Sequence, residues 1–172
     1  MTLDPATLGL LSEVNAAIGD TATSRRYASA METAVLGQEL PFHRAWSLFL
    51  LDHGRKVGEV ARRARAELRT RRDVYGYDLV AWSLHRQGRS REARAFSDSA
   101  LARGTRDAVL WYHAGMIARA TGDDMRACAL LGRALALNPR FHPTGSATAR
   151  AVHDSLTRVT GAGTGGGRAC PT

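Results

Sequence analysis

The chain contains little that would place it among secreted, membrane or fibrous proteins. Two cysteines in 172 residues are too few for the disulfide framework that stabilises small secreted domains. No segment approaches the roughly 18 consecutive apolar residues that a membrane-spanning helix needs. The N-terminal segment Met1–Pro5 lacks the basic start and apolar core of a secretory signal. Aromatic residues make up only 6%, but 44% apolar and 23% charged residues are ordinary values for a globular protein. We therefore expect one soluble, cytoplasmic domain with no membrane partner.

Lysine is almost absent, because Lys56 is the only lysine among the 24 basic residues. A formal net charge of +8 usually points to an anionic partner. Phosphate-binding proteins often use lysine as well as arginine, however, since lysine also serves as a point charge for phosphate. Together with abundant alanine and glycine, this bias is typical of a bacterial genome of high GC content. The charge alone is therefore a weak sign of function.

A period of 34 residues organises the chain, and it is first visible in Gly54, Gly88 and Gly122. Other residues repeat with the same period: Tyr77 and Trp111, Ala93 and Ala127, Ala100 and Ala134. Each period contains an apolar-periodic helix, a turn with glycine and a second, alanine-rich helix. This pattern predicts helices at 5–18, 21–36, 41–53, 57–69, 74–87, 90–103, 108–121 and 124–137. An amphipathic pattern predicts one more helix at 146–159, which would cap the array.

The last period resembles the tetratricopeptide repeat family in nearly its whole motif. It contains Trp111, Gly115, Gly122, Ala127, Leu131, Ala134 and then Asn138-Pro139. The preceding period contains Tyr77, Ala81, Leu84, Gly88, Ala93 and Ala100, and the one before it Trp46, Leu50, Gly54, Val60 and Ala64. A degenerate first unit begins at Pro5. The resemblance implies an all-α, right-handed α-solenoid over residues 1–159, with about four helix pairs and a C-terminal capping helix. The units are about 5–38, 40–73, 74–107 and 108–141, followed by a flexible glycine-rich tail at 160–172.

In this family the first helix of each unit lines a concave groove that usually binds a peptide or another protein. Positions i, i+3, i+7 and i+10 of these helices are then the exposed ones. The residues that we expect to contact a partner are Arg44, Leu48, Tyr75, Asp78, Trp82, His85, Tyr112, Met116 and Arg119. Alternatively, Trp82 and Tyr112 only pack between neighbouring repeats. The lysine and asparagine residues with which one subclass holds a C-terminal carboxylate are not reproduced, so binding of chaperone tails is not expected.

The histidines carry no recognisable metal or catalytic motif. None of the six forms an HExxH sequence or an i, i+4 pair on one helix. Asp78 and His85 are about 10 Å apart along one helix, which is too far for direct acid–base chemistry. We therefore expect no cofactor, no metal ligand and no enzymatic activity, although ligands from different helices can converge without leaving a motif.

The strongest charge feature lies on the second helix of the second unit and in the turn after it. It consists of Arg62, Arg63, Arg65, Arg69, Arg71 and Arg72. Family geometry places such helices on the convex side. The run is either a solvated helix face, partly paired with Glu59 and Glu67, or a patch that binds nucleic acid or an acidic protein. It lacks the interleaved aromatic residues on which bases stack.

The function that the sequence favours is a non-enzymatic scaffold or adaptor that binds a peptide or protein in its groove. One alternative is anion or nucleic-acid binding through the arginine run. Another is a small-molecule-binding accessory protein in a biosynthetic pathway. The first unit also begins almost at Met1 with little N-terminal cap, and an apolar face there would allow dimerisation.

Overall fold

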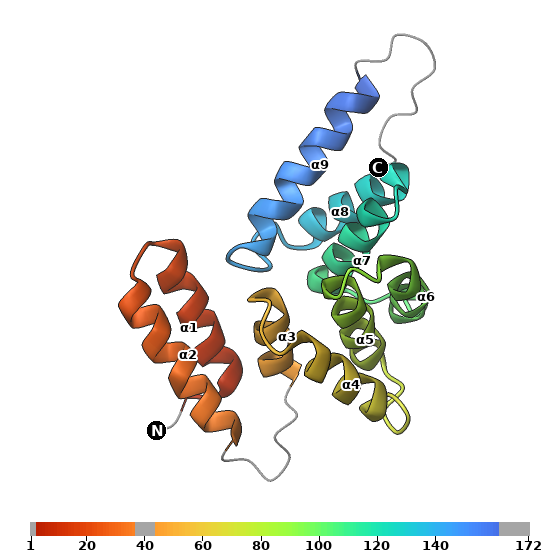
Figure 1. Ribbon diagram of the computed structural model, residues 1–172. Coiled ribbons are helices and arrows are strands. Elements are labelled where there is room, and N and C mark those ends of the chain that lie inside the picture. Colours follow the sequence, from red (N-terminus) through yellow and green to blue (C-terminus); the bar gives the residue numbers. More distant parts are fainter. Residues whose placement is uncertain (1–2, 37–43, 162–172) are drawn as a thin grey trace.

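The computed structural model describes residues 3–36 and 44–161, and within these ranges the protein is entirely helical. The helices are α1 (Pro5–Ala17), α2 (Thr21–Leu36), α3 (Arg44–Asp52), α4 (Val57–Glu67), α5 (Val74–Arg86), α6 (Ser90–Leu101), α7 (Ala108–Ala120), α8 (Asp124–Leu137) and α9 (Gly145–Gly161) (Figure 1). They correspond to the nine predicted helices within a few residues at each end. Two predicted features, the start of the third helix at 41–43 and most of the glycine-rich tail, lie outside the described residues. None of the helices in the described ranges is long and apolar enough to cross a membrane.

Aspartates and glycines determine where the helices begin and end. The Asp4 side chain accepts hydrogen bonds from the backbone N–H groups of Ala6 and Thr7 at the start of α1. Pro5 is the first residue of the helix. Other aspartates cap α5, α7 and α8 in the same way: Asp73, Asp107 and Asp123. Gly88 and Gly122 follow α5 and α7 with φ values of 78° and 80°, a left-handed conformation that costs glycine little. The two glycines are 34 residues apart, and so are the capping aspartates Asp73 and Asp107, so both kinds of helix boundary follow the period.

Successive helices form hairpins, and the most extensive packing joins α5 to α6, α7 to α8 and α1 to α2. The close approach of α7 and α8 requires glycine at position 115, since a Cβ atom there would lie 2.7 Å from the Leu131 side chain. The odd-numbered helices α1, α3, α5, α7 and α9 also contact one another in that order. In Figure 1 the α1–α2 hairpin lies at one end, and α9 extends at the other.

Side-chain contacts between successive odd-numbered helices follow the period of the sequence. Arg44 of α3 donates to Asp78 of α5 at 3.0 Å, and these residues are 34 positions apart. Arg86 of α5 donates to the backbone carbonyl of Asp52, again 34 positions away. In both of these contacts between α3 and α5, residues one period apart in the sequence lie against each other.

The core has two parts. One is centred on α3, α4 and α5 and includes Leu50, Leu51 and Trp82, with Met31 of α2 packed into it. The second joins α7, α8 and α9 around Trp111, and Leu156 of α9 belongs to it. The last helix is therefore held by apolar packing and covers a face of α8 that would otherwise contact water.

Candidate functional site

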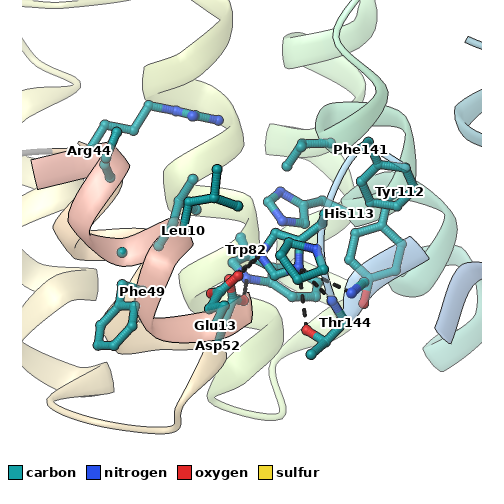
Figure 2. Close-up of a pocket in the computed structure, with 18 of the residues that line it drawn as sticks. Leu10, Glu13, Arg44, Phe49, Asp52, Trp82, Tyr112, His113, Phe141 and Thr144 are labelled. Atoms are coloured by element: carbon teal, nitrogen blue, oxygen red, sulfur yellow. Dashed lines mark hydrogen bonds and ion pairs between the residues drawn. The ribbon is translucent and has the colours of Figure 1, made fainter. Parts of the chain in front are cut away.

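A cavity of about 450 Å³ opens on the side of the molecule where the odd-numbered helices meet. Helices α1, α3, α5 and α7 form most of its lining, together with Met31 of α2, the loop 138–144 that joins α8 to α9, and the start of α9. Leu10 and Glu13 of α1 face Tyr112 and Phe141 across this central cavity (Figure 2). No residue of α4, α6 or α8 is among its lining residues. The cavity is thus built by the helices that the sequence analysis assigned to the groove.

Aromatic rings form one wall of the central cavity, with Trp82 at its centre. The Trp82 ring stacks on His113 at 4.0 Å between centroids and on His85 at 4.9 Å. Tyr112 lies 5.8 Å from Trp82 and 5.2 Å from Phe141, so the rings continue into the loop after α8. Trp82 donates its indole N–H to Asp52 Oδ1 at 2.8 Å. One hydrogen bond and stacking on two imidazoles therefore hold the Trp82 ring in place.

The expectation that Asp78 and Trp82 are exposed is wrong, since each is only 2% exposed, although Trp82 lines the central cavity. Asp78 accepts hydrogen bonds from Arg44 at 3.0 Å and from His113 Nδ1 at 2.8 Å. Asp78 lies on the side of α5 that faces the neighbouring helices α3 and α7. Packing between the helices therefore buries a side chain that the spacing had assigned to partner binding. Burial opposes the charge of Asp78, but the interactions with His113 and Arg44 outweigh it and lower the pKa of this carboxyl. We call Arg44, Asp78 and His113 the buried network.

His85 lines the central cavity but does not form a catalytic pair with Asp78. Its Nδ1 is 2.9 Å from Ser90 Oγ, whereas Asp78 binds Arg44 and His113. Burial, followed by repulsion from Arg86 and His113, lowers the pKa of His85 to about 4. The imidazole is therefore neutral at neutral pH and behaves as part of the aromatic wall.

The other predicted groove residues divide into two groups. Leu48, Tyr112 and Met116 are half-buried and line the central cavity, as does Arg44. Tyr75 and Arg119 are not among its lining residues. Tyr75 is exposed beneath the Arg44 guanidinium, at 4.8 Å, and borders a shallower hollow near Thr105. Arg119 is exposed and paired with Asp124 at the far end of α7.

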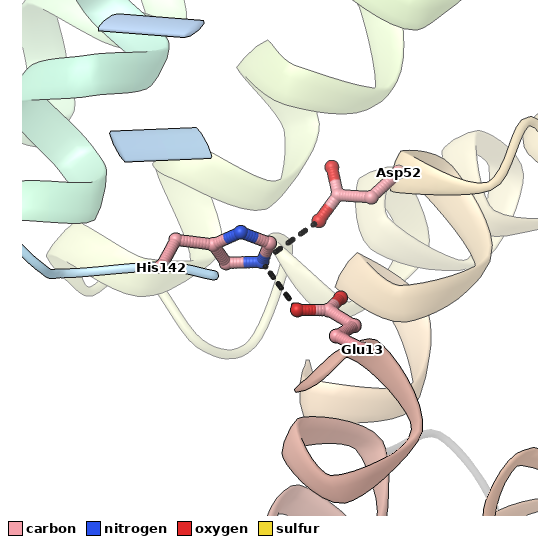
Figure 3. A group of neighbouring side chains, drawn as sticks. All are labelled: Glu13, Asp52 and His142. Atoms are coloured by element: carbon pink, nitrogen blue, oxygen red, sulfur yellow. Dashed lines mark ion pairs between the residues drawn. The ribbon is translucent and has the colours of Figure 1, made fainter. Parts of the chain in front are cut away.

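A cluster that the sequence did not reveal lies at the edge of the central cavity (Figure 3). It brings together Glu13 of α1, Asp52 at the end of α3 and His142 of the loop after α8. His142 Nε2 lies 3.1 Å from Glu13 Oε2 and 3.8 Å from Asp52 Oδ2. We call these three residues the acid–histidine cluster. No sequence signal reveals it, because its members are separated by 39 and 90 positions and follow no motif.

The electrostatic surroundings of the acid–histidine cluster favour the protonated form of His142. Burial disfavours the charged form of His142, but hydrogen bonding and attraction by Glu13, together with attraction by Asp52, outweigh it and raise the pKa of His142. On the other side of the ring, Nδ1 faces the backbone N–H of Gly145 at 3.1 Å and the hydroxyl of Thr144 at 3.3 Å. The loop is thus connected to α1 through a single imidazole.

The arginine run lies away from the central cavity, on α4 and the turn after it. All six side chains belong to exposed residues: Arg62, Arg63, Arg65, Arg69, Arg71 and Arg72. Three of them have carboxylate partners, since Arg63 pairs with Glu59 at 2.8 Å, Arg65 with Glu92 at 3.7 Å and Arg71 with Glu67 at 3.2 Å. Within residues 3–36 and 44–161, no ion pair involves the other three. Acidic neighbours therefore neutralise about half of the run.

The chain matches no protein-family model, and it shows no significant similarity to a curated protein or to a solved structure. Its function must therefore be argued from the geometry of the sites described above.

Proposed function

We propose that this protein is a binding module of the tetratricopeptide type, a right-handed solenoid whose central cavity accepts a peptide segment of a partner protein. Contacts at the 34-residue period between Arg44 and Asp78, and between Arg86 and Asp52, support stacked repeats. The lining of the cavity, which comes mostly from odd-numbered helices, supports a concave binding face.

The observation that carries this proposal is the central cavity itself. Its volume of about 450 Å³ is within the range of pockets that bind organic groups. Apolar and aromatic side chains form most of its wall, with a few fixed polar groups among them, as in sites that bury an anchor side chain. Because Trp82 is held by Asp52 and by stacking, the wall is formed before a ligand arrives, which reduces the entropy cost of binding.

An exposed apolar stripe on α1 favours a peptide over a small molecule. Leu10 lines the mouth of the cavity and is 52% exposed. Val14 is also exposed and lies one helical turn after Leu10, and Ile18, which directly follows α1, is exposed one turn further on, so both continue this face. A small molecule would fill the cavity and leave this stripe in water. An amphipathic or extended peptide would cover both.

The test is selection from a displayed random-peptide library on the wild-type protein, followed by affinity measurements with the selected peptide on variants. We expect Tyr112→Ala, in the cavity wall, to weaken binding about 30-fold, because truncating an aromatic anchor typically costs about 2 kcal/mol. Leu10→Asp, at the mouth, should weaken it by a similar factor. Both residues lie outside the buried network, so the variants are expected to fold.

The matched control is Arg62→Ala/Arg69→Ala on α4, which should leave the affinity unchanged at physiological salt. The proposal fails if no peptide is enriched, or if the peptide binds Tyr112→Ala as well as it binds wild type. Binding that is lost in the arginine variant and falls steeply with salt would instead assign the function to the arginine run.

A further inference from the structure

The acid–histidine cluster has the composition and the convergence of a metal site. A carboxylate from α1, a carboxylate from the end of α3 and an imidazole from the loop after α8 present one ligand atom each, and these atoms lie within 4.8 Å of one another. Ligands about 2.1 Å from a common ion lie about 3–4 Å apart. The His142–Glu13 and His142–Asp52 separations of 3.1 Å and 3.8 Å already match this geometry.

We propose that Glu13, Asp52 and His142 bind a divalent transition-metal ion at the edge of the central cavity. The proposal goes beyond peptide binding and does not depend on it.

The surroundings of the cluster hold its ligands in binding orientations. Asp52 uses Oδ1 to accept the indole N–H of Trp82 at 2.8 Å, and Oδ2 is the atom turned toward His142. Fixing one carboxylate oxygen in this way orients the other, as outer-shell partners do in metal sites. His142 Nδ1 accepts a hydrogen bond from the backbone N–H of Gly145 at 3.1 Å, which holds the imidazole with Nε2 turned toward the two carboxylates.

Charge at the cluster also favours a cation. Glu13 is a buried residue, and its carboxylate shares a small space with that of Asp52. The two carboxylates repel each other across this space, and a divalent ion between them would neutralise both.

One nitrogen and two carboxylate ligands suit Zn²⁺, Mn²⁺, Fe²⁺ or Co²⁺ better than Ca²⁺ or Mg²⁺, which prefer oxygen ligands alone. Three protein ligands leave at least one coordination position open. Since all three residues line the central cavity, that position is accessible to water or to a donor group of a bound ligand. The ion would also cross-link α1, α3 and the loop after α8.

The experiment is a thermal-unfolding series on metal-free full-length protein, with Zn²⁺ or Mn²⁺ added, and a Co²⁺ titration followed by visible absorption. We expect wild type to gain several degrees in Tm at metal concentrations about 100-fold above Kd, since binding only to the folded state stabilises it. Bound Co²⁺ should develop ligand-field bands with one equivalent. His142→Ala and the isosteric Glu13→Gln should lose both responses.

His153→Ala on α9 is the matched control, because its side chain is 24% exposed against 23% for His142, and it should respond as wild type does. Circular dichroism of each metal-free variant checks that it is folded. The proposal is overturned if wild type shows no Tm gain and no Co²⁺ bands. It is equally overturned if folded His142→Ala or Glu13→Gln keeps the wild-type response, since the ion then binds elsewhere.

Discussion

The buried network and the acid–histidine cluster are both built from carboxylate and histidine side chains, but they differ in how accessible these side chains are. In the network, Asp78 lies between Arg44 and His113, residues about one period before and after it, and its carboxyl is almost entirely shielded from solvent. In the cluster, Glu13, Asp52 and His142 come from unrelated positions and line an open cavity. The Asp78 carboxyl is enclosed by residues about one period away. The three residues of the cluster instead line the cavity, where a ligand can reach them.

The largest expected effect is on the buried network. Asp78→Ala should lower the free energy of unfolding by about 3–5 kcal/mol, because it leaves Arg44 and His113 without their shared acceptor. Urea denaturation measures the change. The control is Asp98→Ala on α6, which removes the ion-pair partner of Arg126 at the surface. It should lower the free energy of unfolding by less than about 1 kcal/mol. Equal losses in the two variants would show that burial does not distinguish the network.

A smaller effect is expected on the pH dependence of the free energy of unfolding, through His85 in the aromatic wall. The pKa of His85 is lowered to about 4 from 6.5, so the unfolded chain takes up a proton on His85 before the folded protein does. The stability contributed by neutral His85 is present above pH 6.5 and is lost as the pH falls toward about 4. Allowing for its partial exposure, we expect a loss on the order of 1–2 kcal/mol.

Urea denaturation between pH 7 and pH 4 measures this loss, with His85→Gln as the comparison. The variant has no imidazole at this position, so the difference in stability between the two proteins should change with pH over that window. A difference that stays constant would mean that His85 is not held in its neutral form.

The smallest expected effect on stability is at the acid–histidine cluster. His142→Ala should cost about 1 kcal/mol in metal-free protein, because it removes one hydrogen bond to Glu13 and one acceptor for the Gly145 N–H. Chemical denaturation in the presence of a chelator measures this value. A loss as large as that of Asp78→Ala would make the cluster a structural element like the buried network.

Sequence reasoning was most successful where the period determines the structure. Glycines such as Gly88 and Gly122, each followed within a few residues by the start of a helix, located the hairpins. Leu48, Tyr112 and Met116, which the spacing assigned to a groove, line the central cavity. It did not show that Asp78 and Trp82 are buried, because α5 has neighbouring helices on both sides and periodicity does not show which positions turn toward them. Packing of α3 and α7 against α5 decided that outcome.

The acid–histidine cluster was beyond the reach of the sequence for a different reason. Its convergence depends on how the α1–α2 hairpin approaches α3 and on the path of the loop that presents His142. Neither is set by a local pattern of residues. Only three-dimensional positions bring residues 13, 52 and 142 together.

The central claim is that the central cavity, and not the outer face, is the working surface of this protein. The most direct measurement is the change in backbone amide chemical shifts of ¹⁵N-labelled protein when the library-selected peptide is added. We predict that the changes concentrate at Leu10, at Leu48, at Tyr112 and in the loop 138–144. Changes confined to α4 and its arginines would contradict the account.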